Sequence, residues 1–488
     1  MKLIRHTLFN LIGLGAPLLV AIGTIPVLIQ LLGPARFGLL TLIWAVVSYF
    51  GLFDLGLGRA LTQQLAVVLD NNEHKKIGPI VGTAIILMAL LGVLAGLLMA
   101  ALASWGVAQI QNVPSQREAI NAVYAMSLAM PFIVLTAGFR GILEASHAFG
   151  VINIIRLPMG IFTFLGPLIV VLYSPRLDFV AWILVAGRIA ACLAHGYFAL
   201  DALPKTKHRF GWNIKLLKPL CSAGGWMTIS NVISPFMGYV DRFIIGGILS
   251  AAAVAYYATP QELVLKLWII PSALTAVLFP TFSVQMMQRN KQSWVLFKQA
   301  VHWLYLFLLP ITVVLVLFSY EILSWWVGSD FAQNSAILLQ VFSIGILINC
   351  MAHIPFTLIQ SAGRSRTTAL LHAIELPFFM VLLWWLTNKY GLVGAAFAWL
   401  FRMVIDTISM FILAIPMMGH SVKEIFTNKF LILSSIAVFA FLGACVHQLN
   451  HRILWSLVFA LVCGLMLAIS VGKQTKLFKK LAFKSNGI

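Results

Sequence analysis

The stretch from Phe236 to Leu267 reads FMGYVDRFIIGGILSAAAVAYYATPQELVLKL, which places Asp241, Arg242, Glu262 and Lys266 in otherwise apolar surroundings. On both sides of it, apolar runs of about 20 residues recur, each long enough to cross the ~30 Å hydrocarbon core of a bilayer. A charge in such surroundings costs several kcal/mol unless it is paired or faces water. The stretch therefore predicts membrane-spanning helices whose charges either form structural pairs or line a wet path.

The composition of the whole chain indicates a polytopic helical membrane protein. Of its 488 residues, 61% are hydrophobic and 10% are charged, whereas a soluble chain carries roughly 25% charged residues. The apolar runs are continuous and do not alternate, so a membrane β-barrel is excluded. We expect an all-α protein with about fourteen transmembrane helices. The predicted spans are 8–32, 38–69, 77–105, 118–145, 150–173, 179–199, 215–248, 252–287, 296–319, 334–359, 366–388, 392–418, 425–447 and 450–472.

The basic residues lie mainly in the hydrophilic gaps between these spans. The net charge is +19, but cations in short loops set membrane topology, which argues against nucleic acid as a partner. One side of the membrane, with Lys2 and Arg5 at the N-terminus, holds most of the loop cations. The other side holds only Arg36, Arg117, Arg176, Lys389 and Arg452. Both termini are therefore predicted to be cytoplasmic.

Two pairs of segments indicate an internal duplication. LLGPARFGLL at 31–40 corresponds to ILSAAAVAYY at 248–257. GILEASHAFG at 141–150 corresponds to TLIQSAGRSR at 357–366, at nearly the same offset. A unit of about six spans, an even number, predicts two six-helix lobes related by a pseudo-two-fold axis along the membrane normal.

The duplication divides the chain into four predicted parts. They are an N-lobe at 1–200, a basic cytoplasmic linker at 201–218, a C-lobe at 219–420, and two further helices with a basic cytoplasmic tail at 421–488.

Short motifs occur in a fixed order along the spans. They are Asn10, Pro26, Leu32-Gly33, Phe37-Gly38, Asp54-Leu55-Gly56, DRFIIG at 241–246, the turn leading to Tyr257, Phe279-Pro280 and GLVGAA at 391–396. In this order the chain resembles, over nearly its whole length, the O-antigen-type (Wzx-type) polysaccharide-biosynthesis flippases. These belong to the multidrug/oligosaccharidyl-lipid/polysaccharide (MOP) exporter superfamily. The chain departs from the pattern of this family at Ser250 and Ala255. There the turn at 248–257, in the second half of the chain, lacks the glycines that the family has.

The resemblance implies a transporter and not an enzyme. The implied substrate is an undecaprenyl-pyrophosphate-linked oligosaccharide, moved from the cytoplasmic to the outer leaflet of a bacterial inner membrane. The implied mechanism is alternating access through a cation-lined cavity, coupled to H⁺ or Na⁺. Further implied partners are the lipid bilayer and the polysaccharide polymerase machinery. The chain has no P-loop motif and its five cysteines show no metal-ligand spacing, so no cofactor or metal is predicted.

Cations inside the spans are the candidates for binding the anionic headgroup. A pyrophosphate that crosses hydrocarbon needs fixed cations in place of water, and the planar guanidinium group suits phosphate oxygens. The candidates are Arg242, Arg188, Arg402, Lys266, Arg59 and Arg140. Arg242 and Arg188 rank first, because neither has an acidic residue one helical turn away on its own helix.

Local ion pairs are the competing interpretation for the other cations. Three pairs are each four residues apart and so share a helix face: Arg140/Glu144, Glu262/Lys266 and Arg402/Asp406. Such pairs could be inert. Arg59 and Arg140 also lie near span ends, where a long side chain reaches the interface at low cost.

Asp54, Glu375 and Asp406 are the candidates for ion coupling, because a desolvated carboxyl takes up a proton more readily than one in water. Two other functions stay open. A multidrug cation antiporter of the same superfamily would need unpaired carboxylates in its cavity, and cations slightly outnumber anions inside the spans. A membrane glycan polymerase or ligase would need a large extracytoplasmic loop, whereas the gaps on that side are short.

Overall fold

The computed structural model describes residues 2–50, 56–204, 211–216, 225–288, 292–421, 424, 452–455, 457–458 and 461. These residues form helices joined by short loops, and no β-strand occurs among them. The all-α class that the continuous apolar runs predict is therefore confirmed for the described part of the chain.

The helices follow the predicted spans in order. The first part of the chain forms α1 (Lys2–Phe50), α2 (Leu57–Asp70), α3 (His74–Ala108), α4 (Gln116–Ala145), α5 (Phe149–Tyr173) and α6 (Leu177–Ala202). After the 3₁₀ turn η1 (Ile214–Leu216) come α8 (Gly225–Ile248), α9 (Ala251–Leu265), η2 (Lys266–Trp268), α10 (Ile269–Met287), α11 (Gln292–Leu317), α12 (Ser319–Val327), α13 (Ser329–Ser361), α14 (Ser365–Ala414) and η3 (Ile415–Met418).

Within the described residues, 9 helical segments are long and apolar enough to cross a membrane. Pro17–Ser48 includes parts of two predicted spans, and Ser365–Met418 includes the whole of two, 366–388 and 392–418. The predicted spans at 425–447 and 450–472 lie largely outside the described residues. The total of about fourteen spans therefore stays a prediction.

The long helices α1 and α14 each break at a glycine. Gly33 has φ 75° and Gly391 has φ 62°, values that a residue with a Cβ rarely adopts. Pro34 follows Gly33, and a proline at the first position of a new helix loses no hydrogen bond. Both breaks fall in gaps that the sequence predicts between spans.

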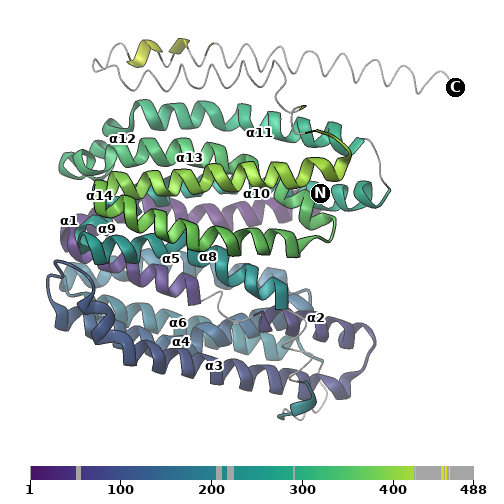
Figure 1. Ribbon diagram of the computed structural model, residues 1–488. Coiled ribbons are helices and arrows are strands. Elements are labelled where there is room, and N and C mark those ends of the chain that lie inside the picture. Colours follow the sequence, from purple (N-terminus) through teal and green to yellow (C-terminus); the bar gives the residue numbers. More distant parts are fainter. Residues whose placement is uncertain are drawn as a thin grey trace. The chain divides into compact units, whose positions relative to one another are not determined.

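The described chain forms two compact units. The first comprises Met1–Ala258 and His372–Ala395. In it, α3, α4 and α6 lie side by side around a core of Leu, Ile, Met and Ala side chains (Figure 1). A Cβ on Gly92 of α3 would lie 2.6 Å from the Cα of Pro131 in α4, so the glycine is what lets the two helices approach. Small residues at such crossings are typical of membrane helix packing.

The second unit comprises Thr259–Leu371 and Ala396–Ile488. Here α11 and α12 pack against α13 (Figure 1). The rings of Phe342 and Trp399 meet edge to face, with centroids 5.2 Å apart, and Gly345 leaves room for the indole. The predicted lobes at 1–200 and 219–420 stay a prediction.

Candidate functional site

A buried acid–base dipeptide lies in the C-terminal half of α8. Asp241 is 0% exposed and Arg242 is 2% exposed. The Tyr257 hydroxyl, on α9, donates a hydrogen bond of 2.9 Å to Asp241 Oδ2. The backbone N–H of Arg242 donates to Asp241 Oδ1, also at 2.9 Å. The guanidinium carbon of Arg242 lies 5.3 Å from the centre of the Tyr239 ring, in cation–π geometry.

These contacts give the two residues different tasks. Asp241 accepts a side-chain bond across the α8–α9 turn, and a buried carboxylate held in this way fixes the two helices relative to one another. Arg242 is stacked on an aromatic face one turn back along α8. Its guanidinium is covered by protein in this conformation, so contact with a solute requires α8 or its neighbours to move.

A backbone clamp closes the end of α8 nearest this dipeptide. The N–H of Gln111, in the loop between α3 and α4, donates to the carbonyl of Gly246 at 2.9 Å. The Gln111 carbonyl in turn accepts from the N–H of Ala251 at 3.0 Å. Gly38 of α1 meets the Ala251 carbonyl so closely that a Cβ has no room there. We call these contacts of Gly38, Gln111, Gly246 and Ala251 the clamp.

The sequence does not predict the contacts of the clamp. Gly38 lies in the segment 31–40 and Ala251 in the segment 248–257, which the internal duplication pairs as equivalent copies and not as neighbours in space. Gln111 is not part of any sequence motif. Both of its clamp bonds use backbone atoms, which every residue type provides. The ends of the predicted spans at which Gly38, Gln111 and Ala251 lie are all predicted to face the outer side of the membrane.

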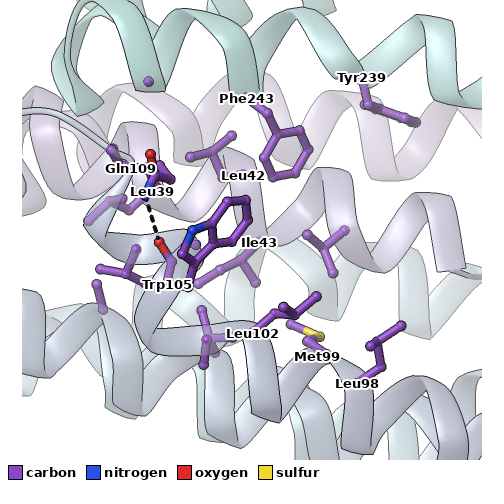
Figure 2. Close-up of a pocket in the computed structure, with 18 of the residues that line it drawn as sticks. Leu39, Leu42, Ile43, Leu98, Met99, Leu102, Trp105, Gln109, Tyr239 and Phe243 are labelled. Atoms are coloured by element: carbon purple, nitrogen blue, oxygen red, sulfur yellow. Dashed lines mark hydrogen bonds between the residues drawn. The ribbon is translucent and has the colours of Figure 1, made fainter.

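An apolar pocket of about 540 Å³ lies between the second half of α1, the C-terminal half of α3 and α8 (Figure 2). Leu42 of α1, Leu98 and Leu102 of α3, and Phe243 of α8 are among its lining residues. Tyr239, the residue whose ring stacks on Arg242, also lines it. Within the part of the chain that the structure describes, this lining includes none of the six predicted cations.

The other predicted cations are dispersed over several helices. Arg59 on α2 and Arg140 on α4 are exposed, and Arg188 on α6 and Arg402 on α14 are half-buried. Lys266 donates to Glu262 at 3.0 Å, and Arg140 lies 3.4 Å from Glu144. Two of the predicted local ion pairs are therefore confirmed.

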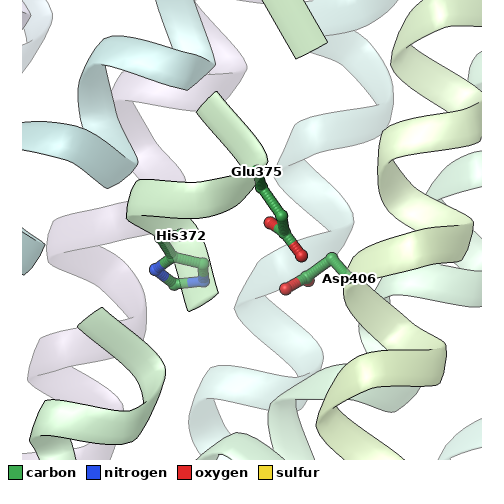
Figure 3. A group of neighbouring side chains, drawn as sticks. All are labelled: His372, Glu375 and Asp406. Atoms are coloured by element: carbon green, nitrogen blue, oxygen red, sulfur yellow. The ribbon is translucent and has the colours of Figure 1, made fainter. Parts of the chain in front are cut away.

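The predicted carboxylates fall in different places. Asp54 lies outside the described residues. Glu375 and Asp406 are 7% and 8% exposed, on the first and second halves of α14 respectively. Figure 3 shows Glu375 one turn from His372 on the same half-helix.

Asp406 belongs to a polar chain inside the second compact unit. Asn349 Nδ2, on α13, donates to Asp406 Oδ2 at 3.0 Å. Trp268 Nε1, in η2, donates to Asn349 Oδ1 at 3.1 Å. The Thr407 hydroxyl also bonds the backbone carbonyl of Ile348 at 3.2 Å. Sequence reasoning found Asp406 but not Asn349, since a lone amide inside an apolar run gives no signal of its partner.

Comparisons with known proteins cover most of the chain. The family model described as "Polysaccharide biosynthesis protein" matches residues 27–337. The chain belongs to this family. A curated relative from Shigella flexneri, named putative O-antigen transporter, is 33% identical over 413 residues, which is 84% of this chain and 96% of the relative. The resemblance predicted from the ordered motifs is thereby confirmed.

Solved structures show that this polysaccharide biosynthesis family member shares the fold of the MOP superfamily. An inward-facing multidrug resistance MATE family transporter of that superfamily matches with a TM-score of 0.73 and 13% identity, over 85% of this chain and 99% of the transporter. Lipid II flippase MurJ in an inward closed conformation matches with a TM-score of 0.62 and 16% identity, over 89% and 98%. At these identities the likeness concerns the fold alone.

Proposed function

We propose that the chain moves undecaprenyl-pyrophosphate-linked oligosaccharide units from the cytoplasmic to the outer leaflet of a bacterial inner membrane. The observation that carries the proposal is the 33% identity of this chain to a protein named putative O-antigen transporter, in an alignment that covers 96% of that protein. A fold shared with a lipid II flippase also supports translocation of a lipid-linked substrate. The glycan headgroup crosses inside the protein while the polyprenyl chain stays in the bilayer.

Arg242 is the residue that we assign to the pyrophosphate. A diphosphate leaving water needs charge-assisted hydrogen bonds, and a guanidinium offers them in a planar fork. Stacking on Tyr239 holds the Arg242 guanidinium in one place, so less side-chain freedom is lost when it binds a phosphate. Arg188 and Arg402, both half-buried on other helices, are assigned secondary contacts.

The clamp is the part that we propose opens and closes. Gly246 lies one helical turn beyond Arg242 on α8, so a movement that breaks the Gln111–Gly246 bond also moves the helix that covers Arg242. With this end closed, the headgroup enters from the predicted cytoplasmic side. With the clamp open, it leaves towards the predicted outer side. Alternating access then consists of exposing the same guanidinium to each side in turn.

The Trp268–Asn349–Asp406 chain supports a role for Asp406 in ion coupling. A buried carboxylate with an amide donor on one oxygen changes its contacts when it gains a proton or a cation, and such a change can bias a helix between two positions. Glu375 and Asp54 are further candidates for this role. H⁺ and Na⁺ are the two coupling ions that we consider, and the polymerase machinery is the proposed receiver of the product.

A test in cells separates this proposal from its rivals. The chain and its Arg242→Gln variant are expressed in a strain whose own copy is deleted, and surface polysaccharide and lipid-linked sugar are measured together. The proposal expects the wild-type chain to restore surface polysaccharide, and the variant to accumulate lipid-linked units inside. Restored surface polysaccharide with Arg242→Gln at wild-type protein levels would contradict the assignment of Arg242. Export of cationic drugs without any effect on polysaccharide would favour a multidrug antiporter.

A further inference from the structure

The pocket between α1, α3 and α8 is lined almost entirely by apolar side chains. Leu42, Leu98 and Phe243 point into it (Figure 2). The amide of Gln109 lies at one end, where its Nε2 already donates to the Trp105 carbonyl at 3.5 Å. A water molecule is retained in a cavity only where it finds two to four polar partners. Water is therefore a poor occupant of this pocket, and an apolar group is a good one.

Part of the pocket lining is exposed on a helix that is predicted to span the membrane. Leu98 and Leu102 line it and are also exposed, by 59% and 47%, on a helix apolar enough to span the membrane. The wall at Phe243 is likewise exposed at its rim. In a membrane the medium around these side chains is lipid, so the ligand that reaches them is a hydrocarbon chain of a lipid.

Tyr239 joins the pocket to the candidate site. It lines the pocket, and its ring lies 5.3 Å from the guanidinium carbon of Arg242. A hydrocarbon chain in the pocket thus lies one aromatic ring away from a cation that would attract an anionic headgroup. This arrangement fits an amphiphile that has its hydrocarbon chain in the pocket on one side of Tyr239 and its phosphate near Arg242 on the other.

We propose that the pocket binds part of the polyprenyl chain of the lipid-linked substrate while its pyrophosphate is near Arg242. The proposal rests on the proposed function for the identity of the lipid. Hydrophobic driving force is small between a lipid tail and an apolar protein surface, because both are equally apolar. Selectivity for the branched chain comes from the fit of its methyl groups against Leu, Phe and Trp side chains, through close van der Waals contact.

Photo-crosslinking tests the proposal on the full chain in lipid nanodiscs. Leu98→p-benzoylphenylalanine places the reactive group at the mouth of the pocket, and Leu193→p-benzoylphenylalanine is the control. Leu193 is 66% exposed on α6 and lies outside the pocket lining. The probe is radiolabelled undecaprenyl phosphate. We expect about tenfold more label at position 98 than at position 193, which corresponds to a preference of about 1.4 kcal/mol.

Competition identifies the source of the chain. Unlabelled undecaprenyl phosphate is expected to remove the label at position 98, and phosphatidylglycerol at the same excess is expected to leave it. Equal label at both positions would overturn the proposal. Equal competition by phosphatidylglycerol would also overturn it, since the pocket would then be a site for bilayer phospholipid.

A second variant keeps this result separate from the proposed function. Leu102→Trp narrows the pocket from a position that is already exposed, and Leu193→Trp is its control. We expect Leu102→Trp to lower the label at position 98 about tenfold at unchanged protein levels. If surface polysaccharide is restored by the wild-type chain while position 98 takes no label, the pocket proposal fails and the flippase proposal stands. If position 98 takes the label specifically while the wild-type chain restores no polysaccharide, the flippase proposal fails and the pocket proposal stands.

Discussion

Arg36 donates two hydrogen bonds to Glu118, from Nε to Oε1 at 3.0 Å and from Nη2 to Oε2 at 3.2 Å. The pair joins the second half of α1 to the first turn of α4. Glu118 Oε1 also accepts a bond from the backbone N–H of Leu177 at the start of α6. One carboxylate therefore ties three helices together close to the clamp loops.

We expect Glu118→Gln to destabilise the protein by about 1.5–3 kcal/mol, the usual contribution of hydrogen bonds to a charged group. The loss is visible as a lower Tm of the detergent-solubilised chain. Lys76→Gln is the matched control, since Lys76 and Glu73 form an exposed pair one turn apart. Such pairs contribute about 0–1 kcal/mol to stability. Equal shifts in the two variants would contradict the account of Glu118.

The clamp predicts that Gly38 tolerates no side chain. Gly38→Ala sets a methyl group against the Ala251 carbonyl, whereas a Cβ on Gly23, on the same helix, meets nothing within 4 Å. Gly38→Ala is therefore expected to hold the clamp open and to abolish polysaccharide export, and Gly23→Ala to leave both unchanged. Val254→Cys, at a position that is fully buried beside the clamp, reports on opening by its reaction with a water-soluble maleimide. Low labelling in the Gly38→Ala background would contradict this prediction.

The paired charges Glu262 and Lys266 are expected to be dispensable. They lie 3.0 Å apart on one helix face and are partly exposed, a geometry that typically contributes about 0.3–0.5 kcal/mol. The double variant Glu262→Gln/Lys266→Gln should restore surface polysaccharide as well as the wild-type chain does. Loss of export at normal protein levels would place Lys266 in the transport path instead.

Asn349 is expected to tune ion coupling through Asp406. Asn349→Leu removes the donor to Asp406 Oδ2 and leaves the indole N–H of Trp268 without its acceptor. Transport should then lose part of its dependence on the H⁺ or Na⁺ gradient, at a stability cost of about 1–3 kcal/mol. Asn334→Leu, on an exposed turn of the same helix, is the control. An unchanged ion dependence in Asn349→Leu would remove Asp406 from the coupling path.

Much of the fold could be predicted because its signals are local. Continuous apolar runs predict helices, and the motif at Gly33 predicts the break inside α1, where φ is positive. The i,i+4 spacing predicted the pairs at Glu262/Lys266 and Arg140/Glu144, because one helix face settles the distance.

What escaped prediction depends on contacts between distant segments. Arg36 and Glu118 lie 82 residues apart, and the pattern around Arg36 indicates only a loop cation. The Gln111 clamp uses backbone atoms, which any residue provides. The burial of Arg242 and the hydrogen bond from Tyr257 to Asp241 also follow from how α8 and α9 pack, and residue spacing does not predict them.

The assignment of Arg242 to the substrate pyrophosphate is tested most directly by translocation of a lipid-linked oligosaccharide in reconstituted vesicles. The wild-type chain, Arg242→Gln, Arg242→Lys and the double variant Glu262→Gln/Lys266→Gln are compared at equal protein content. The account predicts loss of translocation in Arg242→Gln, partial loss in Arg242→Lys because the planar fork is missing, and normal translocation in the double variant. Wild-type translocation by folded Arg242→Gln would contradict it.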